Sequence, residues 1–257
     1  MFSFWLSNSQ HASEAERGEN MNQNTNSTQT VDVLVVGGGV NGAGVALDAA
    51  GRGLSVALCE KGDLAGATSS SSSKLIHGGL RYLEHYEFRL VKEALAEREV
   101  LLEKAPHIMW PLRFRLPHQK HLRPAWMIRI GLFMYDSLAK RNVLPRSKKM
   151  STSPTGPLVN DITTCFEYSD GWVDDARLVV LNALAAQDKG ASIYTRTECI
   201  SAEKQDKLWK VTLKDALGKT FIINAKAVVN AAGPWAVSFL DRLADTKNPN
   251  AMRMVKG

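Results

Sequence analysis

Three glycines near the N-terminus have the spacing of a phosphate-binding turn. Gly37, Gly39 and Gly42 form the pattern G-x-G-x-x-G. In such a turn the first glycine permits a tight bend, the second lets the backbone approach a diphosphate, and the third brings helix and strand close together. Glu60 follows 18 residues after Gly42, where a carboxylate would accept hydrogen bonds from ribose hydroxyls. The pattern predicts a dinucleotide site, and the acid favours FAD or NAD over NADP.

The segments around these glycines are the ones that such a turn requires. Residues 31–36 (VDVLVV) are apolar and β-branched, which is typical of a buried parallel strand, and residues 45–50 have a helical composition. A second apolar run, 54–59, ends directly before Glu60. Because the elements follow in this order, a glycine-rich turn without a ligand is the weaker interpretation. We predict an α/β fold in which the N-terminus of the helix faces the phosphates.

A polar loop comes next, and its residues allow two interpretations. Residues 63–73 (DLAGATSSSSS) lead into KLIHGGLRYL at 74–83. A run of serines is usually a flexible linker. Here, however, the hydroxyl side chains precede a lysine, a histidine, paired glycines, an arginine and a tyrosine, which suit phosphate and ring contacts inside a pocket. The second interpretation predicts that this loop contacts a cofactor or a substrate.

At this point the sequence resembles the FAD-dependent glycerol-3-phosphate dehydrogenases, in particular their aerobic bacterial type. The resemblance covers residues 31–257. Its motifs are VGGG at 36–39 with the glycines that follow, TSSSSSKLIHGGLRYLE at 68–84, FRLPH at 114–118, HLRPAW at 121–126, WVDDARL at 172–178 and AGPW at 232–235. The family continues with a substrate-capping region and a GGK…TYR motif that this sequence lacks. We therefore expect only the N-terminal part of the fold.

The resemblance implies a Rossmann-like FAD-binding fold of the two-dinucleotide-binding flavoprotein type. We expect residues 1–30 to be a disordered tail and residues 31–257 to be the N-terminal part of the oxidoreductase domain. Residues 111–150 would form an inserted basic, amphipathic segment that faces a membrane.

The reaction that the resemblance implies is oxidation of sn-glycerol 3-phosphate to dihydroxyacetone phosphate, with hydride transfer to flavin N5 and electrons passed on to ubiquinone. A homodimer is compatible with it. His77, Arg81 and Tyr82 are the expected catalytic residues: the arginine suits a phosphate, and the histidine suits a base or a polarising group. A purely structural histidine is the alternative.

Further residues are expected to contact FAD. They are Gly37, Gly39, Val40, Asn41, Gly42, Glu60, Lys61, Thr68, Ser69, Ser72, Ser73, Lys74, His77, Gly79, Cys199, Ala232, Gly233 and Trp235. Lys74 is equally compatible with a solvated loop cation.

The net charge of +6 is concentrated in one segment. Residues 111–150 contain ten Lys or Arg residues and one acid, a local charge of +9, so the rest of the chain carries 6 − 9 = −3. Residues 126–141 are apolar with cations at both ends, which suits either a helix in a membrane interface or a buried core helix. The resemblance to a peripheral dehydrogenase favours the inner face of the cytoplasmic membrane. Nucleic-acid binding lacks any recognised motif.

Several classes of protein are excluded or disfavoured. No apolar run is long enough to span a bilayer. The three cysteines are far apart without a CxxC pair, which argues against a metal site and favours a reducing compartment. We expect the 257-residue chain alone to show little activity. The alternatives are a truncated, non-catalytic flavin-fold fragment and a related flavoenzyme that oxidises amines or amino acids.

Overall fold

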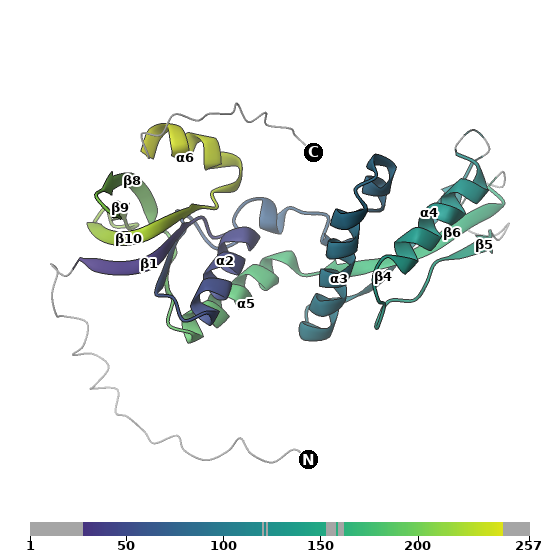
Figure 1. Ribbon diagram of the computed structural model, residues 1–257, viewed down its shortest axis with the longest axis horizontal. Coiled ribbons are helices and arrows are strands. Elements are labelled where there is room, and N and C mark those ends of the chain that lie inside the picture. Colours follow the sequence, from purple (N-terminus) through teal and green to yellow (C-terminus); the bar gives the residue numbers. More distant parts are fainter. Residues whose placement is uncertain (1–27, 120, 122, 153–157, 159–161, 244–257) are drawn as a thin grey trace, which may run out of the picture.

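The computed structural model describes residues 28–119, 121, 123–152, 158 and 162–243, which form two lobes side by side (Figure 1). The first lobe is a sheet with helices on both faces, and the second is a smaller sheet with its own helices. The tail predicted for residues 1–30 lies mostly outside the described residues. Gln29 and Thr30 belong to the first strand, however, because their backbones pair with residues 223 and 224.

The sheet of the first lobe has six strands in the order β7-β2-β1-β10-β9-β8. Their bounds are β1 Gln29–Val36, β2 Val56–Cys59, β7 Ser192–Tyr194, β8 Glu198–Gln205, β9 Leu208–Lys214 and β10 Thr220–Asn230. The four strands from β7 to β10 run parallel, and β8 and β9 continue the sheet in antiparallel pairing. The predicted strands 31–36 and 54–59 are therefore central, as their apolar composition requires.

Helices cover the sheet of the first lobe on both sides (Figure 1). Alanines on α2 (Val40–Gly51) and α5 (Asp175–Asp188) pack against Val35 and Leu58 on one face. On the other face Phe239 of α6 (Ala236–Leu243) packs among buried side chains of the strands. Small side chains let α2 approach the strands closely, which places its N-terminus at the end of β1.

β10 differs from the sequence prediction. Residues 220–223 and 228–233 suggest two strands, whereas the structure has one strand, Thr220–Asn230. Its first half pairs antiparallel with β9, and most of its length pairs parallel with β1. One strand thus ties the antiparallel ribbon to the cofactor-binding half of the sheet.

The second lobe is an antiparallel sheet of β3 (Leu75–Ile76), β4 (Met109–His118), β5 (Lys148–Ser151) and β6 (Thr164–Val173). It is accompanied by η3 (Leu80–His85), α3 (Phe88–Lys104) and α4 (Ala125–Ser137). The sequence did not indicate β4, because Pro111 and Pro117 interrupt it. β4 pairs only with β6 among the described strands, and an edge strand tolerates proline.

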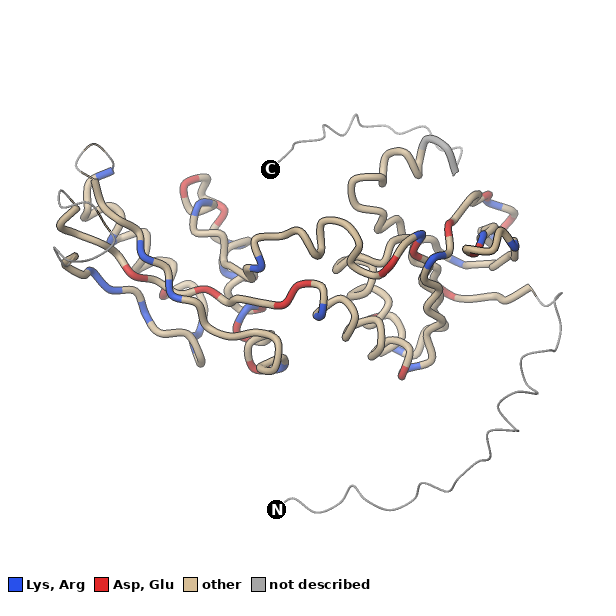
Figure 2. The backbone as a smooth tube through the Cα atoms, turned by 180° about the vertical axis from the view of Figure 1, so that it is seen from behind, with Lys and Arg blue, Asp and Glu red and all other residues tan. Residues whose placement is uncertain are grey.

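The basic segment 111–150 runs through β4, α4 and β5 and is therefore built into the second lobe. Figure 2 shows its cations distributed along that lobe. Several of them pair with acids: Arg113, Arg115 and Lys148 with Glu167, Arg123 with Glu84, and Arg141 with Asp136. Since Glu84 and Glu167 lie outside the segment, they offset part of its predicted charge of +9.

Candidate functional site

The turn between β1 and α2 has a backbone that only glycine fits. Gly37 has a φ of +115°, and a Cβ atom there would lie 2.3 Å from the Ala231 carbonyl oxygen of the neighbouring strand end. A Cβ atom on Gly42 would lie 1.8 Å from the Gly37 carbonyl oxygen. Gly42 thus permits the close approach of helix and turn, and the first turn of α2 opens at the carboxyl end of β1.

Glu60 links the loop after β1 to the loop after β2 through hydrogen bonds of its carboxylate group. Its Oε2 atom accepts a hydrogen bond from the Gly38 N–H at 2.7 Å, and Oε1 accepts one from the Gly62 N–H at 2.8 Å. Each carboxylate oxygen has a second lone pair, which a ribose hydroxyl could use. The acid therefore fixes the glycine turn in addition to its predicted role.

A cavity of about 830 Å³ lies over this edge of the sheet. It is lined by the glycine turn, the loop after β2, the start of β8 and the segment after β10. The predicted cofactor residues on its wall are Gly37, Gly39, Val40, Asn41, Glu60, Lys61, Thr68, Ser69, Cys199, Ala232, Gly233 and Trp235. Twelve residues predicted from four separate segments thus line one cavity.

Two contacts join the walls of this cavity. The Val40 N–H, at the start of α2, donates a hydrogen bond to Ser69 Oγ at 2.9 Å. The Lys61 ammonium group lies 4.1 Å from the centroid of the Trp235 ring, a cation–π contact between the loop after β2 and the segment after β10. A serine hydroxyl group therefore lies at the N-terminus of α2, the position that favours phosphate, and the Lys61 ammonium group lines the same cavity.

The remaining loop residues lie beyond the cavity wall. Ser72 Oγ and Lys74 Nζ both contact Asp175, at 2.7 and 2.5 Å. Burial alone would raise the pKa of the Asp175 carboxyl, but the hydrogen bonds from Lys74 and Ser72 outweigh it and lower the pKa. In the described structure these two side chains thus bind an aspartate at the start of α5.

Of the predicted catalytic residues, His77 lies in the turn between β3 and η3, and Arg81 and Tyr82 lie at the start of η3. His77, Arg81 and Tyr82 are exposed, and none of them lines the cavity. Gly79 has a φ of +64°, and its N–H donates to His77 Nδ1 at 3.0 Å. The structure therefore brings the three side chains to one short segment, together with Gly79, while Ser73 lies earlier on the same exposed loop.

The glycine turn, the helix N-terminus, the Glu60 carboxylate and the cavity that they line all fit a flavin dinucleotide. A protein-family profile described as "FAD dependent oxidoreductase" matches residues 32–257. The chain belongs to this family.

The relatives of this chain carry related names. It is 62% identical over 229 residues to the glycerol-3-phosphate dehydrogenase of Pseudomonas tolaasii, covering 89% of this chain and 45% of the relative. It is 58% identical to the aerobic glycerol-3-phosphate dehydrogenase of Escherichia coli, covering 89% and 46%. It is also 54% identical to the D-erythritol 1-phosphate dehydrogenase of Brucella abortus, again covering 89% and 46%.

A solved structure that is similar to this chain carries the same name as two of these relatives. The glycerol-3-phosphate dehydrogenase of Bacillus halodurans, complexed with FAD, aligns with a TM-score of 0.60 and 30% identity, covering 83% of this chain and 36% of that one. The chain spans about half the length of the curated relatives that it matches. The predictions of the family, of the FAD-binding fold and of FAD as its cofactor are confirmed.

The sequence did not point to some of the residues that build this site. The sequence allows either Asp174 or Asp175 to cap the helix that follows them; in the structure Asp174 is the cap, and Asp175 binds Ser72 and Lys74 of the serine-rich loop 63–74. Cys59 and Phe239 line the cavity beside Cys199. Cys59 directly precedes the predicted Glu60 and could have been found from that position, but Phe239 carries no sequence signal for a site.

The two cavity thiols are poor nucleophiles. Cys59 and Cys199 are both buried and free. Burial raises the pKa of Cys199 to about 12 and raises that of Cys59 further. A protonated, buried thiol is inert, so these cysteines shape the cavity wall.

Proposed function

We propose that the whole protein to which this chain belongs oxidises sn-glycerol 3-phosphate to dihydroxyacetone phosphate with FAD. The observation that carries the proposal is the cavity formed by the glycine turn, Glu60 and the segment 231–235, in a chain that also exposes His77 and, four residues later, Arg81 of η3. The names of the relatives support a substrate that is a phosphate ester of a small polyol, since both glycerol 3-phosphate and D-erythritol 1-phosphate belong to this class.

In this proposal the chain binds the cofactor mainly through its backbone. The turn at Gly37–Gly39 and the first N–H groups of α2 hold the diphosphate, and Glu60 accepts hydrogen bonds from the ribose. The segment from Ala232 to Trp235 contacts the flavin half. Bound FAD supplies the hydride acceptor, flavin N5.

The turn after β3 would bind the substrate. Arg81 pairs with the phosphate, because a guanidinium group matches phosphate oxygens geometrically, and Tyr82 lies beside it. His77 contacts the oxygen on carbon 2. As a hydride and its two electrons leave carbon 2, the hydroxyl proton must leave the oxygen, and a carbonyl group forms.

We also propose that α4 rests on the inner face of the cytoplasmic membrane, with ubiquinone as the electron acceptor. Trp126, Ile130 and Phe133 occupy one side of the helix and are 63%, 51% and 59% exposed. Leu132 and Tyr135, on another side, are buried. Exposed apolar patches mark interaction sites. Among the described residues, no helix has the length and apolarity needed to cross a bilayer.

Vesicle binding tests the membrane proposal. We expect Phe133→Ser to lower co-sedimentation with anionic phospholipid vesicles several-fold. Leu217→Ser is the matched control, because Leu217 is 93% exposed on the turn between β9 and β10, far from α4 in the sequence. Equal binding by the two variants would contradict this role of α4.

Spectroscopy and dye reduction test the enzymatic proposal. We expect the 257-residue chain to bind FAD but to reduce little dye with glycerol 3-phosphate. The polypeptide expressed from the natural gene, with whatever follows codon 257, should reduce dye with glycerol 3-phosphate. Reduction with amino acids and not with polyol phosphates would establish the alternative flavoenzyme, and FAD binding without any activity would establish a non-catalytic fragment.

A further inference from the structure

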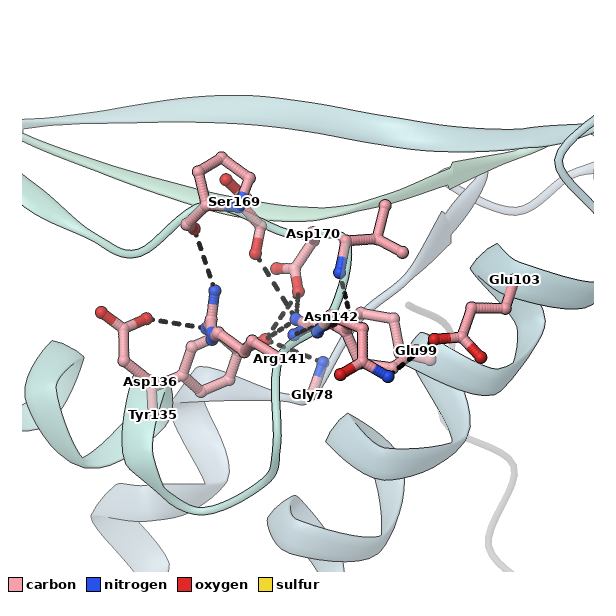
Figure 3. Close-up of polar contacts among 12 residues, drawn as sticks. Gly78, Glu99, Glu103, Tyr135, Asp136, Arg141, Asn142, Ser169 and Asp170 are labelled. Atoms are coloured by element: carbon pink, nitrogen blue, oxygen red, sulfur yellow. Dashed lines mark hydrogen bonds and ion pairs between the residues drawn. The ribbon is translucent and has the colours of Figure 1, made fainter.

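The turn that carries His77 rests on a buried polar network in the second lobe. Gly78 and Gly79 are buried, and a Cβ atom on Gly78 would lie 2.8 Å from the Tyr135 ring. The Gly78 N–H donates a hydrogen bond to Tyr135 Oη at 2.8 Å. Figure 3 shows Gly78 beside Tyr135, below Asp170. The turn therefore sits directly against one tyrosine of α4.

The Tyr135 hydroxyl group uses its proton and both lone pairs. It accepts hydrogen bonds from Gly78 and from Arg98 Nη1 at 3.3 Å, and it donates one to Asp170 Oδ1 at 2.7 Å. Arg98 is fully buried and donates to the same oxygen of Asp170 at 2.5 Å. Burial raises the pKa of the Tyr135 phenol, and Asp170 raises it further, so the phenol stays protonated.

Three further contacts fix this network in place. Glu99 Oε2 accepts hydrogen bonds from the backbone N–H groups of Asn142 and Val143, each at 3.0 Å. Arg98 Nη1 also lies within hydrogen-bond distance of the Ser169 carbonyl oxygen. The network thus joins α3, α4 and β6. Removing one partner of a buried ion pair is costly, because the other charge is left buried without compensation. The Tyr135 hydroxyl therefore has little freedom to move away from Gly78.

The geometry of the turn decides which nitrogen of His77 carries the proton. His77 Nδ1 accepts a hydrogen bond from the Gly79 N–H at 3.0 Å. A nitrogen that accepts this bond is unprotonated, so the neutral imidazole carries its proton on Nε2. The side chain is exposed. It therefore offers an Nε2–H donor, and it has no free basic nitrogen.

We propose that Tyr135 is a positioning residue that fixes the turn 77–79 and thereby presents His77 as a hydrogen-bond donor, not as a base. The inference rests on the proposed function, in which the acceptor is the oxygen on carbon 2 of the polyol phosphate. It follows that a different group takes the hydroxyl proton during the oxidation.

Amide hydrogen exchange and nitrogen NMR test this proposal without any turnover. Tyr135→Phe removes the acceptor of the Gly78 N–H, and we expect peptides that cover residues 75–86 to exchange roughly tenfold faster. Tyr168→Phe is the matched control, since Tyr168 packs edge-on against Tyr135 while its hydroxyl makes no hydrogen bond to the network among the described residues. Exchange in β1 and α2 should stay unchanged in both variants.

The ring nitrogens of His77 provide a readout that a merely structural role would not give. In the unaltered protein at alkaline pH, we expect Nδ1 to be unprotonated and Nε2 to be protonated, with the signals assigned from a His77→Gln variant. In Tyr135→Phe the Nδ1 signal should move toward that of an imidazole without this hydrogen bond.

Several outcomes would overturn the inference. An Nδ1-protonated His77 in the unaltered protein would do so even if Tyr135→Phe failed to fold. Equal exchange of residues 75–86 in the two tyrosine variants would do so as well. A chain that binds no FAD would instead contradict the proposed function, while the exchange and NMR results would still decide the role of Tyr135.

Discussion

Gly42→Ala should weaken FAD binding, whereas Gly44→Ala should not. Both glycines lie in α2, two residues apart, so both substitutions add one methyl group to the same helix. The new Cβ atom at position 42 would lie 1.8 Å from the Gly37 carbonyl oxygen, while at position 44 it would meet nothing within 4 Å. The pair of variants therefore isolates the contact between helix and glycine turn.

The expected loss of FAD affinity follows from how far the new methyl group must move away from the Gly37 carbonyl oxygen. Ordinary contact begins at 3.4 Å, so the methyl group at position 42 is short by 3.4 − 1.8 = 1.6 Å. Such overpacking costs about 1–3 kcal/mol. Alanine gains up to about 1 kcal/mol over glycine in a helix interior, but this gain applies to both variants and cancels in their difference. If the helix shift is transmitted to the diphosphate, FAD affinity falls by about 5- to 150-fold.

Titration of the apoprotein with FAD, followed by flavin fluorescence, measures this difference. Thermal unfolding without FAD gives the stability of each variant, so that a loss of affinity can be separated from a loss of folding. Equal affinities for Gly42→Ala and Gly44→Ala would refute the assignment of the glycine turn as the diphosphate site.

Three other predictions concern loops, charges and thiols. Asp175→Asn removes the ionic partner of Lys74, and limited proteolysis should cut the serine-rich loop several-fold faster than in an Asp188→Asn control. Arg113 lowers the pKa of Glu167 to about 2, so this carboxylate stabilises the fold above about pH 4.5 and loses that effect as the pH falls toward 2. Glu167→Gln should therefore flatten the melting temperature in that window, and an unchanged slope would contradict the pairing. Because the pKa of Cys199 is about 12, a disulfide reagent at neutral pH should label it only after unfolding, and rapid labelling of the native chain would show the thiol to be accessible.

The cofactor half of the site was predictable because its signals are local. The glycines, the flanking strands and Glu60 lie within one short stretch, and their roles depend on backbone geometry that the residue types themselves impose. The composition of residues 220–233 predicts two strands where the structure has β10, because the pairing with β1 and β9 that makes it one strand leaves no mark in its composition.

The second lobe and the serine-rich loop were harder to predict because their contacts are remote in sequence. Gly78 and Tyr135 are 57 residues apart, and Ser72 and Asp175 are 103 apart. Tertiary packing of turns, loops and helices brings such pairs together. Arg98 and Asp170 lie on different elements, α3 and β6, and only the structure shows that they form a buried ion pair.

The two lobes hold the two halves of the site by different means, and this makes their contributions separable. The glycine turn that binds FAD depends on the backbone conformation at Gly37 and Gly42, whereas buried charges around Tyr135 hold the turn of His77. The glycine turn belongs to the first lobe and the polar network around Tyr135 to the second. The effects of Gly42→Ala and Tyr135→Phe on the free energy of unfolding should therefore be additive within about 0.5 kcal/mol. Each should also leave the other's local readout unchanged. Coupling larger than this would mean that the serine-rich loop, which runs from β2 in the first lobe to β3 in the second, transmits strain between them.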